Sequence, residues 1–283
     1  MHTIQELVQL IKLEPLEENM FRGQNYQAPW NRVFGGQVLA QALYAATQTV
    51  PQDRKVHSVH AYFILPGDIT LPIIYMVDRI RDGGSFTTRR VVAIQKGRPI
   101  FNMSASFQLT QEGLDHQIAM PEVPSPETLQ TDVELLEKMT EVPKLFRGAL
   151  LPRPIEFRPV ESFELMTDKP LPLRHVWMRT KDSLADDPAL HQQILAFSSD
   201  YNLLSTALLP HAQYLQDKDL QLASLDHAMW FHRDFRMDEW LLFELESPSA
   251  SNTRGFSRGN FFSQEGKLVA SVVQEGLMRV LSN

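Results

Sequence analysis

The apolar positions of the chain divide it into helical segments and strand-rich blocks. In residues 189–209 apolar side chains recur at spacings of three and four, which is typical of one long helix that ends before Pro210. The positions of this stripe are Leu190, Ile194, Phe197, Tyr201, Leu204 and Leu208. Small and apolar residues predict a second helix over residues 35–46, and Ile4, Leu7, Val8 and Ile11 predict a short amphipathic helix over residues 3–14, stopped by Pro15.

Strand-length apolar runs follow the first main helix and lie on both sides of the second. The first block spans residues 57–108 and contains the turn signal Asp82-Gly83-Gly84, and residues 20–24 predict a short strand before it. The second block contains runs at residues 155–160, 175–179, 220–232, 240–246 and 255–274. Several of these runs lack strict alternation, which suits a sheet buried on both faces. A helix followed by antiparallel strands, found twice, predicts an α+β fold.

The two blocks also resemble each other in detail. One opens around His60 and closes at Gln108, 48 positions later, and the other opens around His227 and closes at Gln274, 47 positions later. Each has a late turn signal before its closing strand, and each follows a helix, near Gln37 and near Asp200 respectively. The chain therefore looks like one unit written twice, which indicates a duplicated domain.

The segment between the blocks has a different composition. Residues 110–153 are rich in proline and acidic residues, and Ser125-Pro126-Glu127 predicts the start of a helix. We therefore expect an N-terminal unit over residues 1–115, a linker with one or two helices over residues 116–153, and a C-terminal unit over residues 154–283.

Composition excludes several classes of function. The formal net charge of -7 argues against nucleic acid as a main partner, and the absence of cysteine removes disulfides, thiolate nucleophiles and Cys-type zinc sites. No apolar run reaches the length of a membrane span, and the first residues lack the pattern of a signal peptide. We therefore expect a cytoplasmic protein without stable membrane insertion.

Asp200 is the first candidate for chemistry, because it lies on the border of the buried stripe of a helix, where a carboxylate loses hydration and needs partners. The repeat brings in Ser224 and Gln274 as strand residues of the same unit, and together the three groups could hold one water molecule. An exposed or capping Asp200 is the alternative. Gly35-Gly36 at a helix start indicates either a tight turn or the close approach of a ligand to backbone N–H groups.

Two other patterns have weaker functional interpretations. Gly255-Phe256-Ser257-Arg258-Gly259 matches the Gly-x-Ser-x-Gly nucleophile elbow, but it is followed by a strand and a hairpin turn, so Ser257 is expected to be a strand residue. His227 and His232 lie five positions apart on an expected strand and face opposite sides, so they are expected to be structural or interface histidines and no metal site is predicted.

The longest patterns resemble the type II acyl-CoA thioesterases, the TesB family. The resemblance covers nearly the full length and is most specific in Ser199-Asp200-Tyr201-Asn202, in the strand from Ala223 to Arg233, in Val273-Gln274-Glu275-Gly276, and in the run from Trp30 to Gln37. It implies a double hotdog: two helices, each wrapped by an antiparallel sheet, with the sheets side by side. It also implies hydrolysis of acyl-CoA thioesters without an acyl-enzyme or a cofactor.

The same resemblance implies roles for single residues. The catalytic Asp of the family falls on Asp200 and its Gln on Gln274, and its hydroxyl residue, Thr in familiar bacterial members, falls on Ser224. The corresponding position of the first unit is near Gln37, so one site per chain is expected, with backbone N–H groups of a helix N-terminus holding the oxyanion. The residues that bind substrate are not assigned, and a homodimer or homotetramer is expected.

Two alternatives stay open. One is a non-catalytic acyl-CoA-binding protein with the same fold, which the full Asp, Ser and Gln set argues against. The other is a hotdog enoyl-CoA hydratase, a class with Asp-x-Asn-Pro-x-His on the equivalent helix. Here Leu203 and Ser205 occupy the Pro and His positions, so the acid/base pair of a hydratase is incomplete.

Overall fold

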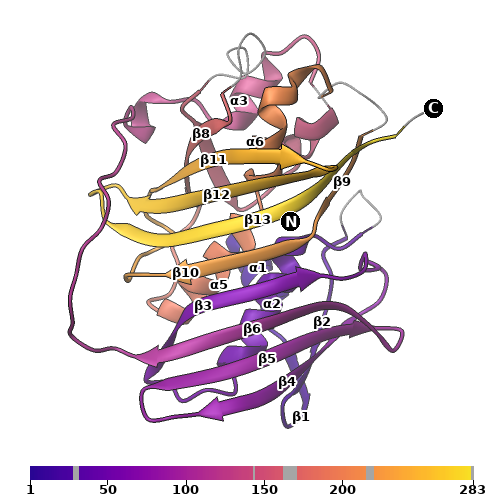
Figure 1. Ribbon diagram of the computed structural model, residues 1–283, viewed down its shortest axis with the longest axis vertical. Coiled ribbons are helices and arrows are strands. Elements are labelled where there is room, and N and C mark those ends of the chain that lie inside the picture. Colours follow the sequence, from indigo (N-terminus) through magenta and orange to yellow (C-terminus); the bar gives the residue numbers. More distant parts are fainter. Residues whose placement is uncertain (28–31, 143, 162–170, 215–219, 282–283) are drawn as a thin grey trace.

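Figure 1 shows the computed structural model, which describes residues 1–27, 32–142, 144–161, 171–214 and 220–281. Its strands form one sheet in which neighbouring strands are antiparallel. From the centre outward, one half contains β3 (Arg54–Phe63), β6 (Arg98–Leu109), β5 (Phe86–Gln95), β4 (Ile73–Asp82), β2 (Met20–Gly23) and β1 (Glu14–Glu17). The other half contains β10 (Asp226–Phe231), β13 (Leu268–Val280), β12 (Arg254–Ser263), β11 (Leu241–Ser251), β8 (Leu173–Thr180) and β7 (Ile155–Pro159). The strand order is therefore the same in both halves, and the α+β prediction is confirmed.

The two halves join through β3 and β10 at the centre of the sheet. In this antiparallel pair, Tyr62 lies opposite Asp226 and Val59 opposite Met229. Val59 and Met229 are both fully buried. A further short strand, β9 (Leu220–Ser224), pairs with the C-terminal part of β13. The continuous hydrogen bonding across the centre makes one sheet out of two repeated units.

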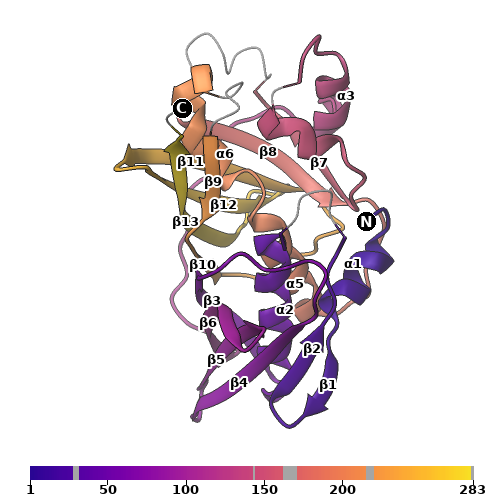
Figure 2. The same cartoon turned by 90° about the vertical axis from the view of Figure 1, so that its right-hand side faces the viewer.

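Helices cover one face of this sheet (Figure 2). The helix α2 (Gly35–Thr47) packs against β4, β5 and β6 in the first half, and α6 (Leu203–Leu208) packs against β11, β12 and β13 in the second. The helix α5 (Pro188–Ser199) packs against α2, and α1 (Ile4–Ile11) packs against α2 and α5. No helix in these described ranges is long and apolar enough to cross a membrane.

The N-terminal helix is shorter than the expected segment of residues 3–14. It begins after Thr3, which caps it together with Glu6, and it ends at Ile11. Pro15 lies in the exposed edge strand β1, where a missing N–H group costs little.

The expected long helix over residues 189–209 is in fact two helices. The first ends at Ser199, and the second begins at Leu203 after Asn202, whose φ of 73° lies in the left-handed region. Asparagine tolerates this conformation better than most residues. A final 3₁₀ segment, η3 (Leu209–Tyr214), follows and contains Pro210. The apolar stripe continues through the break, which explains why spacing alone predicted one helix.

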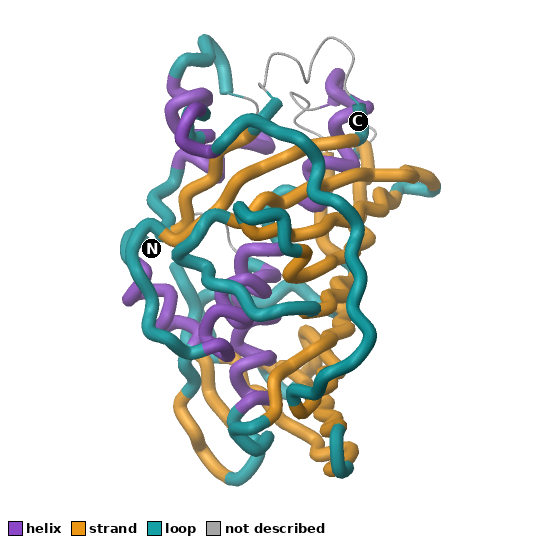
Figure 3. The backbone as a smooth tube through the Cα atoms, turned by 90° about the vertical axis from the view of Figure 1, so that its left-hand side faces the viewer, coloured by secondary structure: helices purple, strands orange, loops and turns teal. Residues whose placement is uncertain are grey.

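The connection between the halves runs as an extended loop before its first helical turn (Figure 3). The predicted helix start at Ser125 gives only a 3₁₀ turn, η1 (Pro126–Thr128). The helix α3 (Asp132–Glu137) begins instead after Thr131, whose side chain forms a capping box with Glu134. A second 3₁₀ segment, η2 (Lys144–Leu150), follows. The exact division into units over residues 1–115, 116–153 and 154–283 stays a prediction.

This connection also covers part of the outer face of the sheet. Trp177, Trp240, Leu242 and Phe262 are buried there, with Met120, Val123 and Leu129 packed against them. Burial on both faces is thus limited to one part of β8, β11 and β12, at Trp177, Leu242 and Phe262. Elsewhere more and less buried positions mostly alternate, as they do throughout β10, so the predicted burial on both faces holds only for this part of the sheet.

Candidate active site

Asp200 lies in the break between α5 and α6, where the chain leaves one helix and has not yet entered the next. Its backbone still has helical angles, and it is the C-terminal cap residue of α5. The side chain is largely buried and turns toward the start of α2 rather than lying along a helix face. The break therefore presents the carboxylate at the meeting point of both halves of the molecule.

The start of α2 receives this carboxylate. The Gly36 N–H group donates to Asp200 Oδ2 over 2.9 Å. A Cβ atom at Gly35 would lie 2.7 Å from the same oxygen, and one at Gly36 would lie 2.2 Å from Phe197 O on α5. The two glycines thus allow a close approach, but not the approach of a ligand that one of the two interpretations of Gly35-Gly36 expected. The group that approaches is a carboxylate of the same chain.

The two strand candidates reach Asp200 from the sheet. Ser224 ends β9, and it lies opposite Gly276 of β13, two residues beyond Gln274. Ser224 Oγ donates to Asp200 Oδ1 over 3.3 Å, and Gln274 Nε2 donates to Ser224 Oγ over 3.0 Å. The structure therefore brings together all three residues that the sequence singled out.

Burial sets the acidity of this carboxyl group. Loss of hydration raises the pKa of Asp200 from 3.8 to about 6, although the hydrogen bonds from Gly36, Gln274 and Ser224 oppose the shift. At neutral pH the group is still mainly ionised. It is also a much stronger proton acceptor than an exposed carboxylate, which is what a general base requires.

His227 is a fourth polar residue of this cluster, and the sequence gave it no part in the chemistry. It is fully buried on the inner face of β10. Its Nδ1 lies 2.6 Å from Gln274 Oε1 and its Nε2 3.0 Å from Ser199 Oγ. Burial lowers the pKa of His227 to about 4, partly opposed by Gln274. The sequence did contain a signal for this role: His227 lies three residues after Ser224, on the inward-facing side of the strand.

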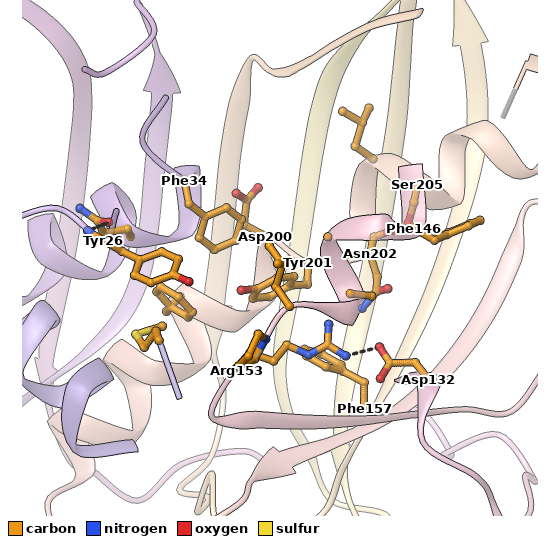
Figure 4. Close-up of a pocket in the computed structure, with 18 of the residues that line it drawn as sticks. Tyr26, Phe34, Asp132, Phe146, Arg153, Phe157, Asp200, Tyr201, Asn202 and Ser205 are labelled. Atoms are coloured by element: carbon orange, nitrogen blue, oxygen red, sulfur yellow. Dashed lines mark hydrogen bonds and ion pairs between the residues drawn. The ribbon is translucent and has the colours of Figure 1, made fainter. Parts of the chain in front are cut away.

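Two cavities meet at Asp200. The first, here called the aromatic cavity, has a volume of about 250 Å³ and is lined by aromatic side chains from both halves. They are Tyr26, Phe34, Phe146, Phe157, Phe197 and Tyr201. Figure 4 shows Phe34 and Tyr201 beside Asp200, with the Arg153–Asp132 ion pair farther along the wall. The second cavity, of about 380 Å³, is lined by residues that include Arg32, Val33 and Phe63 and also reaches Ser224.

Known proteins match the chain along its length. The family described as acyl-CoA thioesterase matches residues 150–277, and the acyl-CoA thioesterase N-terminal domain matches residues 26–108. Acyl-coenzyme A thioesterase 8 of Homo sapiens is 42% identical over 282 residues, which cover 96% of this chain and 88% of the relative. The chain belongs to the TesB-like type II acyl-CoA thioesterases.

Solved structures agree with this membership. Acyl-CoA thioesterase II TesB2 from Mycobacterium marinum is 43% identical, with a TM-score of 0.81 over 97% of this chain and 98% of that one. A protein with a hot dog fold from Alicyclobacillus acidocaldarius, 18% identical, has a TM-score of 0.78 over 98% and 99% of the two chains. The double hotdog prediction is thus confirmed, and thioester hydrolysis is the activity of this acyl-CoA thioesterase.

Other residues considered in the sequence lie elsewhere. Ser257 is buried in β12 and donates to Leu203 O over 2.8 Å, so its strand context is confirmed. His232 is exposed beyond the end of β10 and bonds Ser271 Oγ. Among the residues described, no three His, Asp or Glu side chains gather as a metal site would need. Trp30 and Asn31 of the quoted run lie outside the described residues.

Two further residues bear on the alternatives of the sequence. Ser205, at the His position of the hydratases, donates its hydroxyl proton to Asn202 O and lines the aromatic cavity. Gln37, near the position that corresponds to Asp200 in the first half, also lines this cavity. Its amide bonds Tyr26 N and Asn25 Oδ1, so it supports the loop before α2.

Proposed function

We propose that Asp200 is the general base of this thioesterase and that it activates a water molecule for direct attack on the thioester. The observation that carries the proposal is the cluster of carboxylate, hydroxyl and amide within hydrogen-bonding distance, placed where two cavities meet. Asp200 takes one proton from the water, and Ser224 and Gln274 fix the direction of its lone pair. The raised pKa of Asp200 supports this role.

The chemical step balances without a cofactor. The water oxygen forms a bond to the carbonyl carbon, and the carbonyl oxygen becomes an oxyanion. When this collapses, the C–S bond breaks and the CoA thiolate receives the proton held by Asp200. The Gly36 N–H group is already bonded to Asp200, so it orients the base. The expected oxyanion donors at a helix N-terminus stay a prediction.

The two cavities suit the two arms of a thioester. We propose that a fatty acyl chain occupies the aromatic cavity, because its lining is mostly aromatic and apolar. The pantetheine arm then occupies the second cavity, where the exposed Arg32 offers a cation to the CoA phosphates. We further propose a cytoplasmic location. We also propose that the chain forms a homodimer or homotetramer, and the exposed side chains of Tyr62 and Ile80 on the sheet support this association.

The experiment is a hydrolysis assay over a series of acyl-CoA chain lengths, with released thiol as the readout. Ala149→Trp narrows the aromatic cavity and Val33→Trp narrows the second. Ala149→Trp is expected to lose activity selectively toward long acyl chains. Val33→Trp is expected to raise KM similarly for every chain length. The opposite pattern would reverse the assignment of the arms. Full activity of Asp200→Asn would remove the proposed base.

A further inference from the structure

The buried His227 has a hydrogen-bonding partner at each ring nitrogen, and neither partner is charged. Gln274 Oε1 lies at Nδ1 and Ser199 Oγ at Nε2, at 2.6 and 3.0 Å. The residue lines neither of the two cavities. It therefore reaches the reacting atoms only through Gln274.

The partners of Asp200 fix where the protons of this cluster lie. An ionised carboxylate only accepts, so Ser224 must donate its hydroxyl proton to Asp200 Oδ1. The Ser224 oxygen then accepts from the amide nitrogen of Gln274. This orientation turns the amide oxygen toward His227, so the proton of a neutral imidazole must be on Nδ1.

The other side of the ring agrees with this assignment. A neutral ring protonated at Nδ1 has a bare Nε2, which can accept the hydroxyl proton of Ser199 over 3.0 Å. Ala196 O lies 2.9 Å from the same hydroxyl and is its second possible acceptor. The result is a one-way series of donors from His227 through Gln274 and Ser224 to Asp200.

The opposite orientation of the Gln274 amide has a chemical cost. Its oxygen would face Ser224 and draw the hydroxyl proton away from Asp200, leaving that carboxylate opposite an oxygen lone pair. In shape the two orientations of an amide are nearly identical, so packing does not choose between them. An N–H donor at the position of Nδ1 does choose between them, because it bonds the amide oxygen and not the amide NH₂ group.

We propose that His227 is a positioning residue, whose Nδ1–H group holds the Gln274 amide in the orientation that leaves the Ser224 proton for Asp200. The proposal rests on the proposed roles of Asp200, Ser224 and Gln274 in hydrolysis. His227 does not exchange protons with the substrate in this scheme, and its neutral ring serves as a fixed donor.

Two substitutions of equal size test this. His227→Asn places an amide N–H near the position of Nδ1, whereas His227→Leu places a methyl group there, and both leave the same space where Nε2 was. We expect kcat of His227→Leu to fall about 3- to 10-fold, the range of one neutral hydrogen bond, with His227→Asn within about twofold of the parent. KM should stay unchanged in both, because residue 227 lines neither cavity.

Folding is followed by circular dichroism and thermal midpoint for each variant. If His227→Leu does not fold, His227→Gln replaces it, because its amide reaches the position of Nε2 and leaves no donor at that of Nδ1. Equal loss of kcat in the folded Asn variant and in the variant without a donor would overturn the proposal. A kcat equal to that of the parent enzyme in the variant without a donor would also overturn it.

A double-mutant cycle separates this proposal from the one on which it rests. In the background Gln274→Ala the acceptor is gone, so His227→Asn and His227→Leu should have equal kcat. A loss in His227→Leu of the same factor in both backgrounds would mean that His227 acts elsewhere, which overturns the positioning role alone. Parental kcat in Gln274→Ala itself would instead refute the role of Gln274 in hydrolysis.

Discussion

The variant Asp200→Asn replaces a largely buried carboxylate with an amide of the same size. The amide oxygen can still accept from Gly36, so the start of α2 should keep its place. What disappears is the negative charge and nearly all of the basicity. We therefore expect two opposite effects, a large loss of activity and a gain in stability.

The expected loss of activity follows from the role of a positioned base, which typically contributes about 10²–10⁴-fold in rate. Because the change keeps the shape of the site, kcat should fall by roughly this range and KM much less. Ser224→Ala and Gln274→Ala should each lose less, since the base remains. Combined with Asp200→Asn, they should be clearly less than additive, because all three groups act on one water molecule.

The expected gain in stability follows from the shift of the Asp200 pKa from 3.8 to about 6. A carboxyl group that binds its proton more tightly in the folded state stabilises the protein below pH 3.8, and this contribution is lost as the pH rises through about 6. Two pKa units correspond to about 3 kcal/mol, an upper value for the cost of the ionised group near pH 8. The neutral amide avoids this cost.

Two assays on the same preparation measure both effects. Thiol release from an acyl-CoA gives kcat, and thermal unfolding followed by circular dichroism at pH 8 and pH 4 gives the stability. Asp200→Asn should have the higher unfolding midpoint at pH 8, and the difference should become small at pH 4. A folded variant with activity within about twofold of the parent contradicts the role of Asp200. A lower midpoint at pH 8 contradicts the argument from burial.

Four further outcomes are expected. The kcat/KM of the parent enzyme should fall about tenfold per pH unit below about pH 6, where Asp200 becomes protonated; a flat profile from pH 7 to 5 would contradict this. Gly36→Ala should lower the free energy of unfolding in a denaturant titration by about 1–3 kcal/mol, because its Cβ would meet Phe197 O, and an unchanged midpoint would speak against that contact. Ser257→Ala should keep most activity at a cost of about 1 kcal/mol from its lost bond to Leu203, and labelling of Ser257 by a phosphonate would refute this. Light scattering should give a multiple of the 32.4 kDa chain mass, and a monomer mass would count against association.

Much of the fold could be predicted because its signals are local. The small residues after Gly35-Gly36 predicted α2, and the turn at Asp82-Gly83-Gly84 separates β4 from β5 as expected. The repeat predicted two halves of equal topology. The family resemblance implied only that the two sheets lie side by side. The pairing of β3 with β10 at the centre was not predicted, because pairing between distant strands has no local signal.

The sequence singled out three residues that the structure brings together, Asp200, Ser224 and Gln274, but it did not predict their geometry. Spacing placed Asp200 at the edge of a helix stripe, while the residue in fact ends α5. The break is made by the left-handed Asn202, whose conformation the apolar stripe does not record. The bond between Asp200 and Gly36 joins residues 164 positions apart. His227 was missed because a lone histidine on a strand is usually structural, and only its partners distinguish it.

The hydrogen bond from Gly36 to Asp200 makes the two repeats dependent on each other. The first repeat supplies a helix start that only a residue without a side chain can provide, and the second supplies the acid that this helix start receives. Gln37 stands where the first repeat could have carried an acid of its own. The two copies of the repeat therefore differ in what they contribute: the first provides the N–H donor and the second provides the carboxylate. Either half produced alone would therefore lack one side of the contact between Gly36 and Asp200, on which the proposed base depends.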